Sequence, residues 1–239
     1  MKAVIIAAGE GKRMQPLTFT TPKPMLKLRG KPLIEHIIDV LPSEVDELII
    51  VIGYLGDQIK EHFGSEYNGR SITYVQQTQA KGTFHALKMC ESSLSENERF
   101  VVIYADDMHG KAGIEQAVAS GRQVVLTAEI EDPRKFGVLE IDENGKILNL
   151  EEKPEHPKSH LICNGAYILS KDIFNYEPEM RKGELYLADA ILKMVQAGNA
   201  VYAMSGSFWL TIGTPEELQR AEDLYEQLET KKATTKVLV

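Results

Sequence analysis

The residues from Ala7 to Pro24, AAGEGKRMQPLTFTTPKP, place glycines and cations directly after an apolar run. Gly9 and Gly11 would let backbone N–H groups come close to an anion, as glycine-rich turns between a strand and a helix do for phosphates. Arg13 offers a planar fork of donors, and Lys23, with a proline on each side, offers a compact point charge on a restricted backbone. These residue types predict a site for a polyphosphate such as a nucleoside triphosphate.

Two common phosphate-binding motifs do not fit this loop. A Walker A loop ends in Gly-Lys followed by Ser or Thr, whereas Lys12 is followed by Arg13. A dinucleotide-binding fingerprint has a third glycine at the position that Met14 occupies. Both motifs are therefore excluded.

Two carboxylates close another apolar run farther along the chain. Val101-Val-Ile-Tyr-Ala is followed directly by Asp106 and Asp107. The carboxyl end of a sheet strand is where α/β folds place their ligands. Asp106 is therefore a candidate site residue, and Asp107 is either a helper ligand or a cap for the following helix.

The pattern of elements predicts how these residues are positioned. Short β-rich runs alternate with amphipathic helical stretches, which indicates an α/β fold with a mostly parallel, Rossmann-like central sheet flanked by helices. Near-continuous apolar runs such as Leu48–Ile52 indicate strands covered on both faces. Strands are predicted at about 2–8, 47–53, 71–77, 99–105 and 123–130, and helices at about 31–41, 57–63, 81–94 and 111–120.

The pattern of alternating strands and helices changes after Asp132 and Pro133. Phe136–Ile141 and Ile147–Glu152 flank Asp142-Glu-Asn-Gly145, which predicts a β-hairpin. A strand at about 162–169, a helix at 185–197, a strand at 199–205 and a closing helix from Pro215 to about Glu229 complete the second half, with Thr214 as the helix cap and Glu217 three residues on.

Composition limits the class of protein. The chain has 239 residues, 43% of them hydrophobic and 26% charged, which fits one soluble globular domain. It shows neither a membrane-spanning apolar stretch nor an N-terminal secretion signal, so we expect a cytoplasmic protein that makes no membrane contact. The net charge of −8 disfavours nucleic acid as a partner. Cys90 and Cys163 are expected to be buried thiols without a metal, and a homo-oligomer is compatible with the sequence.

Together these motifs resemble the sugar-1-phosphate nucleotidyltransferases, also called NDP-sugar pyrophosphorylases, and in particular their glucose-1-phosphate thymidylyl and uridylyl branches. The resemblance extends over essentially the whole chain, and its motifs follow in family order. It implies one nucleotidyltransferase domain at 1–229, with a nucleotide-binding half at about 1–130 and a sugar-phosphate-binding half, which contains the hairpin, at about 131–229. Residues 230–239 would form a C-terminal tail.

The resemblance also implies roles for the residues of the first half. Arg13, Lys23 and Asp106 would be the catalytic residues, with Arg13 on the β- and γ-phosphates, Lys23 near the α-phosphate and Asp106 as the Mg²⁺ ligand. Gln77 would bind the base edge through its amide, which offers both a donor and an acceptor. His85 is expected to be a packing or surface residue of the following helix. The implied nucleotide-binding residues are Ala8, Gly9, Gly11, Arg13, Lys23, Gln77, Gly82 and Thr83.

The second half matches the sugar side of the family. Phe136-Gly-Val138, Glu151-Glu-Lys-Pro154 and Asn164-Gly-Ala-Tyr167 resemble consecutive family elements. They imply that the backbone of Gly137 and the carboxylate of Glu152 meet sugar hydroxyls, and that Lys153 meets the sugar phosphate. The implied sugar-phosphate-binding residues are Gly137, Glu152, Lys153, Asn164 and Thr211.

Thr211 is a departure from the family pattern. In WLTIGTPEEL, Trp209 to Leu218, it replaces the aspartate that commonly completes the family's metal site. A hydroxyl is a weak Mg²⁺ ligand beside a carboxylate. Three alternatives follow: Asp106 with phosphate oxygens and water suffices, another carboxylate substitutes, or the protein has lost catalysis. We favour the first, because Mg²⁺ commonly keeps water and substrate phosphates as ligands.

The expected substrates are a nucleoside triphosphate and a sugar-1-phosphate, with UTP or dTTP and glucose-1-phosphate as the preferred pair. Gln77 followed by Gly82-Thr83 suits the uridine- and thymidine-using branches. The alternatives are a mannose-1-phosphate guanylyltransferase, a cytidylyltransferase acting on another phosphorylated alcohol and, from a different class, a catalytically impaired subunit that senses an NDP-sugar.

Overall fold

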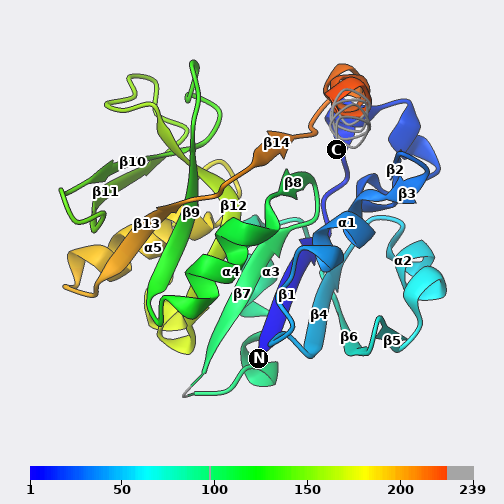
Figure 1. Cartoon of the computed structure of the whole chain (residues 1–239), viewed down its shortest axis with the longest axis horizontal. Helices are drawn as coiled ribbons and strands as arrows, with labels where there is room; N and C mark the ends of the chain where they lie inside the picture. The colour runs from blue at the N-terminus through cyan, green and yellow to red at the C-terminus, as the bar shows by residue number, and fades with distance from the viewer. Residues whose placement is uncertain (97, 225–239) are drawn as a thin grey trace, which may run out of the picture.

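The computed structural model describes residues 1–96 and 98–224, and a ten-stranded sheet forms its centre (Figure 1). Four strands of the first half pair in parallel, with β1 between β4 and β7 and with β6 beside β4. Parallel strands bring their carboxyl ends to one edge, so the loops that follow β1 and β7 lie close together. These strands are β1 (Lys2–Ala7), β4 (Glu47–Ile52), β6 (Arg70–Gln76) and β7 (Arg99–Tyr104).

The second half joins this sheet through antiparallel pairs. The long strand β12 (Leu161–Ser170) pairs with β7, with β9 (Gln123–Glu129) and, at its start, with β10. The predicted hairpin is confirmed as β10 (Gly137–Ile141) and β11 (Ile147–Glu152). The strand β13 (Val201–Ser205) runs parallel to β9. The sheet is therefore mixed, with most of its parallel pairs in the first half.

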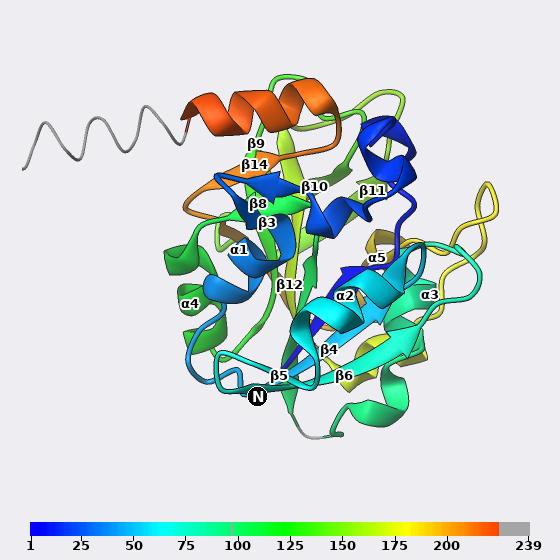
Figure 2. The same cartoon turned by 90° about the vertical axis from the view of Figure 1, so that its right-hand side faces the viewer.

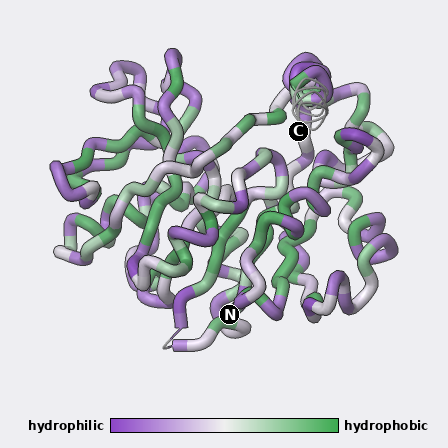
Figure 3. Tube along the Cα trace, viewed as in Figure 1, coloured by the Kyte–Doolittle hydropathy of each residue, from purple (hydrophilic) through white to green (hydrophobic). Residues whose placement is uncertain are grey.

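Helices cover both faces of the sheet, as the α/β prediction requires. Figure 2 shows α1 and α4 on one side of the strands and α3 and α5 on the other, and Figure 3 shows the hydrophobic stretches gathered along the strands between them. Each face has its own buried cluster, because alternate residues of β1, such as Val4 and Ile5, enter different clusters. The helices are α1 (Leu33–Asp39), α2 (Gly56–Phe63), α3 (Thr83–Lys88), α4 (Lys111–Ala119) and α5 (Leu187–Gln196).

The structure corrects one predicted helix and adds short elements. The helix expected over 81–94 begins only at Thr83, because Gly82 has φ of 92°, and it continues as the separate turn η4 (Glu91–Ser93). The other short elements, too short to leave a periodic pattern, are η1 (Lys12–Met14), η2 (Leu17–Phe19), η3 (Lys23–Met25), η5 (Lys171–Asn175), β2 (Lys27–Leu28), β3 (Lys31–Pro32), β5 (Glu66–Tyr67), β8 (Asp107–His109) and β14 (Trp209–Thr211).

The closing helix begins where the sequence predicts. Residues 215–224 are helical, and the Thr214 hydroxyl accepts a hydrogen bond from the Glu217 backbone N–H at 3.3 Å. The Glu217 carboxylate in turn accepts from the Gly213 N–H at 2.6 Å, so the cap works in both directions. The predicted continuation of this helix to residue 229 and the predicted tail at 230–239 lie outside the described residues.

Two further predictions concern the cysteines and membrane-spanning segments. Cys90 and Cys163 are free and buried, as predicted. Within the part of the chain that the structure describes, no helix has the length and apolar character that crossing a membrane requires.

His109 is buried without a hydrogen bond in the small sheet that β8 forms with β14. It lies opposite Trp209 and is 4% exposed, and neither ring nitrogen has a partner among the described residues. Burial disfavours the charged imidazolium and lowers the pKa of His109 to about 4. The unfolded chain therefore binds a proton more readily than the folded one between about pH 4 and 6.5.

We predict that His109→Leu makes the protein less sensitive to mild acid. A histidine with a depressed pKa contributes full stability above pH 6.5, and the wild type should lose about 2 kcal/mol of it through this group between pH 7 and pH 5. Urea unfolding at both pH values measures the loss. The variant should lack this part of the decline, while His156→Leu, which removes an exposed histidine, should keep it. Parallel declines in the wild type and His109→Leu would contradict the prediction.

Candidate active site

The loop after β1 folds back on itself around Gly11. This residue has φ of 63°, and a Cβ there would lie 3.0 Å from the Thr18 side chain and 3.1 Å from that of Lys23. The Thr18 hydroxyl donates to the Gly11 carbonyl at 2.9 Å and holds the turn closed. At Gly9 a Cβ would meet nothing within 4 Å, so the loop faces open space there. A backbone that is open on one side and packed against a lysine on the other suits an anion.

Lys23 and Asp106 form an ion pair at the centre of the site. The Lys23 ammonium lies 2.9 Å from Asp106 Oδ2, although the two residues are 83 positions apart. Lys23 is buried at the start of η3, whereas the Asp106 side chain, just after β7, is 42% exposed. The cation is thus held rigidly while its carboxylate partner remains open to a ligand.

Asp107 lines the cleft together with Asp106 and also holds β14. Its carboxylate accepts hydrogen bonds from Trp209 Nε1 at 3.2 Å and from the Ile212 backbone N–H at 3.4 Å. Burial, with the negative charge of Asp106 as the second cause, raises the pKa of Asp107 to about 7. The suggested cap role is wrong, because Asp107 lies in β8 and Gly110 is the residue before α4.

Thr211 lies directly opposite Asp107 in the β8–β14 ladder, with its side chain hydrogen bonded to that carboxylate. The departure from the family pattern is thus next to a carboxylate on the neighbouring strand. Among the described residues, no group of three or more His, Cys, Asp and Glu side chains is arranged to hold a metal ion. Asp106, Asp107 and Thr211 together offer only oxygen atoms, which are the donors that Mg²⁺ prefers.

Gln77, the residue predicted to bind the base edge, directly follows β6. Its side-chain Nε2 donates to the Gly82 carbonyl at 3.4 Å and lies 2.9 Å from His85 Nδ1. His85 is therefore more than the packing or surface residue that was expected, since it contacts the predicted base-reading amide.

The turn at Gly82 and Thr83 is fixed against the segment before α5. A Cβ at Gly82 would lie 2.5 Å from the Leu185 carbonyl oxygen, and backbone hydrogen bonds join Leu185 to both Lys81 and Phe84. The Thr83 hydroxyl accepts from the Leu187 N–H at 3.0 Å, in the first turn of α5. Thr83 thus serves the fold as well as lining the cavity.

The residues predicted to bind the sugar phosphate lie mainly on the hairpin and on β12. Gly137 pairs with Glu152, whose carboxylate is largely buried, and burial raises the pKa of that carboxyl. The Lys153 ammonium lies 3.3 Å from Glu152 Oε1 and 4.6 Å from the centre of the Tyr186 ring. Asn164 is 1% exposed, and its Nδ2 has no partner among the described residues.

Two adjoining cavities, of about 370 and 480 Å³, connect all these groups. They share Gly9, Arg13, Thr83 and Asp106 in their walls, so they form one cleft. Every site residue predicted from the sequence lines it. The larger cavity adds Gly11 and Lys23, and the smaller one adds Ala8, Gln77, Gly82, Gly137, Glu152, Lys153, Asn164 and Thr211.

The sequence analysis missed several cleft residues. Glu184 and Tyr104 line both cavities, and Lys135, Tyr167 and Tyr186 line the smaller one. Lys135 directly precedes the Phe136-Gly-Val138 motif, and this position could have identified it as a cleft residue. Glu184 lies in an irregular segment and Tyr186 lies directly before α5, and the packing of Leu185 on the Gly82 turn brings both to the cleft.

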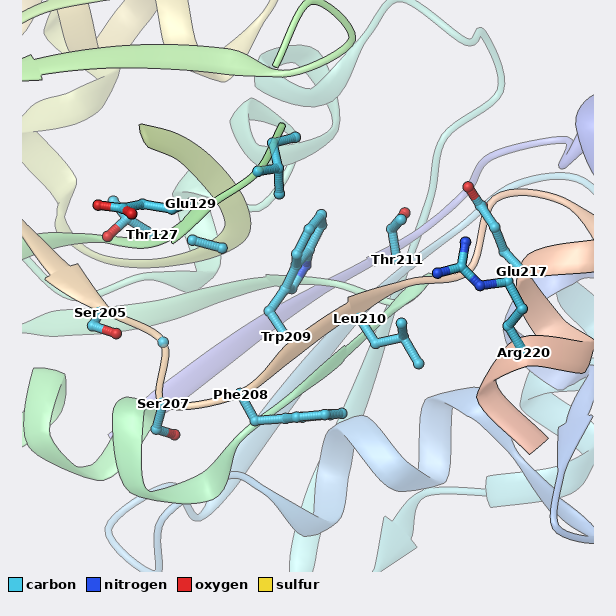
Figure 4. Close-up of a pocket in the computed structure, with 13 residues that line it drawn as sticks. Thr127, Glu129, Ser205, Ser207, Phe208, Trp209, Leu210, Thr211, Glu217 and Arg220 are labelled. Atoms are coloured by element: carbon cyan, nitrogen blue, oxygen red, sulfur yellow. The ribbon is translucent and has the colours of Figure 1, made fainter. Parts of the chain in front are cut away.

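A separate cavity of about 380 Å³ shares only Thr211 with the predicted site residues (Figure 4). Figure 4 shows Trp209 between Glu129 of β9 and Thr211, with Arg220 of the closing helix at the far end. Since Thr211 also lines the cleft, β14 forms a wall of both hollows.

We predict that Gly82→Ala is far more damaging than Gly69→Ala. Both glycines have positive φ, but a Cβ at Gly69 would meet nothing within 4 Å. Gly69→Ala should therefore cost about 1 kcal/mol of backbone strain. Gly82→Ala should cost about 2 kcal/mol more, because the methyl group collides with the Leu185 backbone. Free energies of unfolding in urea measure both, and equal losses would contradict the packing argument.

Comparison with known proteins agrees with this geometry. The sequence is 33% identical over 98% of its length to the UTP–glucose-1-phosphate uridylyltransferase AglF of Haloferax volcanii, which it covers completely. It is also 33% identical to the bifunctional protein GlmU of Methanococcus aeolicus, of which it spans about half, 53%.

Two solved structures share the fold with a TM-score of 0.82. One is a putative glucose-1-phosphate thymidylyltransferase from Bacillus anthracis in complex with a sucrose, 32% identical, with 94% of each chain covered. The other is a UDP-glucose pyrophosphorylase complexed with UDP-glucose, 26% identical, with 95% of this chain and 98% of the other covered.

These findings confirm the predicted fold, the resemblance and the predicted enzyme class, a nucleotidyltransferase of the NDP-sugar pyrophosphorylase type. Residues 2–228 match the family described as Nucleotidyl transferase. The chain, with its cation-lined loop after the first strand, belongs to the nucleotidyl transferase family.

Proposed function

We propose that this nucleotidyltransferase joins UTP or dTTP to glucose-1-phosphate, giving the nucleoside diphosphate sugar and pyrophosphate. The observation that carries the proposal is the single cleft with a cation at each end. Lys23 lies beside Asp106 at the glycine-loop end, and Lys153 lies beside Glu152 at the hairpin end. Two anionic substrates that must approach each other need such separated positive charges.

The chemistry follows from positioning. An oxygen of the sugar phosphate attacks the α-phosphorus in line, a P–O bond forms there, and the bond to the leaving pyrophosphate breaks. The nucleophile is already an anion, so no general base is required, and the protein contributes orientation and charge neutralisation. Arg13 stabilises the charge that develops on pyrophosphate, and Lys23 that on the α-phosphoryl group.

A magnesium ion fits the donor set. Asp106 has an exposed carboxylate in the cleft, and Asp107 and the Thr211 hydroxyl lie next to it. One or two carboxylates together with substrate phosphates and water are a common Mg²⁺ environment. When bound, the ion would neutralise phosphate charge. Lys23 holds Asp106 in place and Trp209 holds Asp107, so the chain fixes these oxygens before any ion arrives.

The choice of nucleotide and sugar is supported by the relatives. AglF is named for UTP and glucose-1-phosphate, and the two solved structures are named for glucose-1-phosphate thymidylyl transfer and for UDP-glucose. Gln77 and Gly82 lie together in the wall of the cleft, where the side-chain amide of Gln77 can pair with the edge of a base.

A non-catalytic sensor of NDP-sugars is the competing function, and Thr211 motivates it. The same geometry argues against it, because Asp107 supplies a carboxylate directly opposite Thr211 and the Lys23–Asp106 pair is intact. A protein that only sensed NDP-sugars would have no need to keep the Lys23–Asp106 ion pair.

The decisive experiment measures pyrophosphate release with four nucleotides against glucose-1-phosphate, mannose-1-phosphate and glucosamine-1-phosphate, in the presence of Mg²⁺. Release with UTP or dTTP and glucose-1-phosphate supports the proposal. Preference for GTP with mannose-1-phosphate, or for CTP, would replace it with one of the alternative enzymes. Tight binding of UDP-glucose with no release from any pair would establish the sensor instead.

We predict that Lys23→Met reduces turnover about 100-fold or more while the dissociation constant of UTP changes less than about tenfold. Methionine keeps the length of the buried side chain and removes the charge that acts on the transition state. Single-turnover kinetics and calorimetric titration separate the two effects.

The matched control is Lys12→Met in the same loop. Lys12 is 75% exposed and paired with Glu10, so its loss should leave turnover nearly unchanged. Equal turnover in Lys23→Met and the wild type would refute the assigned role of Lys23.

A further inference from the structure

The side-chain amide of Gln77 is held in one orientation. Gln77 is 9% exposed, and its Nε2 is directed at two protein atoms, the Gly82 carbonyl oxygen at 3.4 Å and His85 Nδ1 at 2.9 Å. If the amide were reversed, its oxygen would face the Gly82 carbonyl oxygen, and two acceptors would repel each other. The Gly82 carbonyl therefore favours this orientation, and the shorter contact with His85 Nδ1 holds the amide in it.

This orientation also fixes the tautomer of His85. A nitrogen that receives a hydrogen bond from Gln77 has no proton of its own, so Nδ1 is the acceptor and the ring proton is on Nε2. His85 lies on α3 one turn beyond Gly82, and it is half-buried. Its position across the Gly82 turn brings Nδ1 to Gln77.

The consequence concerns the other end of the amide. Both Gln77 N–H groups are directed at protein acceptors, while no residue that the structure describes donates a hydrogen bond to Gln77 Oε1. Gln77 lines the cleft, so its oxygen is the polar atom that remains for a ligand. The amide, which could offer either a donor or an acceptor, is reduced to an acceptor.

The geometry points to His85 as the positioning residue that makes the base site an acceptor. This inference rests on the proposed function, since it takes the cleft to bind a nucleoside triphosphate. Bases with an N–H at the centre of the pairing edge, the imide of uracil and thymine or the N1–H of guanine, can donate to Gln77 Oε1. Cytosine and adenine present a lone pair at that atom and are rejected, because two acceptors then face each other.

The first test measures the His85 tautomer directly. In ¹⁵N-labelled wild-type protein at neutral pH, two-bond ¹H–¹⁵N correlation spectra should show His85 with the proton on Nε2 and a bare Nδ1. Addition of UDP-glucose should leave this pattern unchanged and shift the Gln77 side-chain amide resonance. A proton on Nδ1 would overturn the inference, because the ring would then donate to the amide and the amide would be reversed.

The second test compares His85→Leu with His85→Asn. Leucine removes the acceptor, whereas asparagine can place Oδ1 where Nδ1 stands. The readout is the ratio of kcat/KM for UTP to that for CTP, with glucose-1-phosphate fixed. The ratio should fall about tenfold in His85→Leu, because the freed amide can turn to offer its N–H to cytosine, and it should be largely restored in His85→Asn.

If His85 had a purely structural role, His85→Leu would lower kcat/KM equally for UTP and CTP and leave their ratio unchanged. That result would overturn the inference. The panel also separates this failure from that of the proposed function. A wild-type enzyme that prefers GTP over ATP and CTP would refute the proposed base and leave the role of His85 standing. A wild-type enzyme that uses UTP and CTP equally would keep the transfer reaction and refute the role of His85.

Discussion

The Lys23–Asp106 ion pair is the constraint around which the rest of the site is arranged. The chain carries a net charge of −8, so the cations of a site proposed for a triphosphate must be gathered locally. A buried lysine needs a partner, and the partner comes from the end of β7, which runs parallel to β1 as its neighbour. Gly11 is required because it has a positive φ and a Cβ there would lie only 3.1 Å from the Lys23 side chain. The pair thus joins the two strand ends where α/β folds bind ligands.

The strand β12 connects this centre to the sugar side. Its first part pairs with β10 of the hairpin and its last part pairs with β7, so one strand fixes both halves relative to each other. Between these parts the register against β9 shifts from Cys163 to Tyr167, and the irregularity places Asn164 in the wall of the cleft. Bulges of this kind commonly direct side chains into sites. The hairpin then supplies Gly137 and Glu152 from paired positions.

The long elements and the motif residues can be predicted from the sequence, because each requires particular residue types close together in the chain. A strand buried on both faces needs a continuous apolar run, and a phosphate loop needs glycine and a cation, so β1, β4 and β7 and the residues of the opening loop were predictable. Two-residue strands leave no period, so β2 and β3 were missed. The contact of His85 with Gln77 was missed because it crosses a turn that only the φ of 92° at Gly82 reveals.

Thr211 places a hydroxyl, and not a second carboxylate, opposite Asp107. In the β8–β14 ladder, residue 211 lies directly opposite Asp107, whose buried carboxylate already lies next to Asp106. An aspartate at 211 would place like charges opposite each other in a ladder, an arrangement that is destabilising, with Lys23 as the nearby cation. Threonine avoids that repulsion and gives Asp107 a hydroxyl to bond with, as Trp209 gives it an indole N–H. A carboxylate on β8 opposite a hydroxyl on β14 therefore avoids the repulsion that carboxylates on both strands would bring.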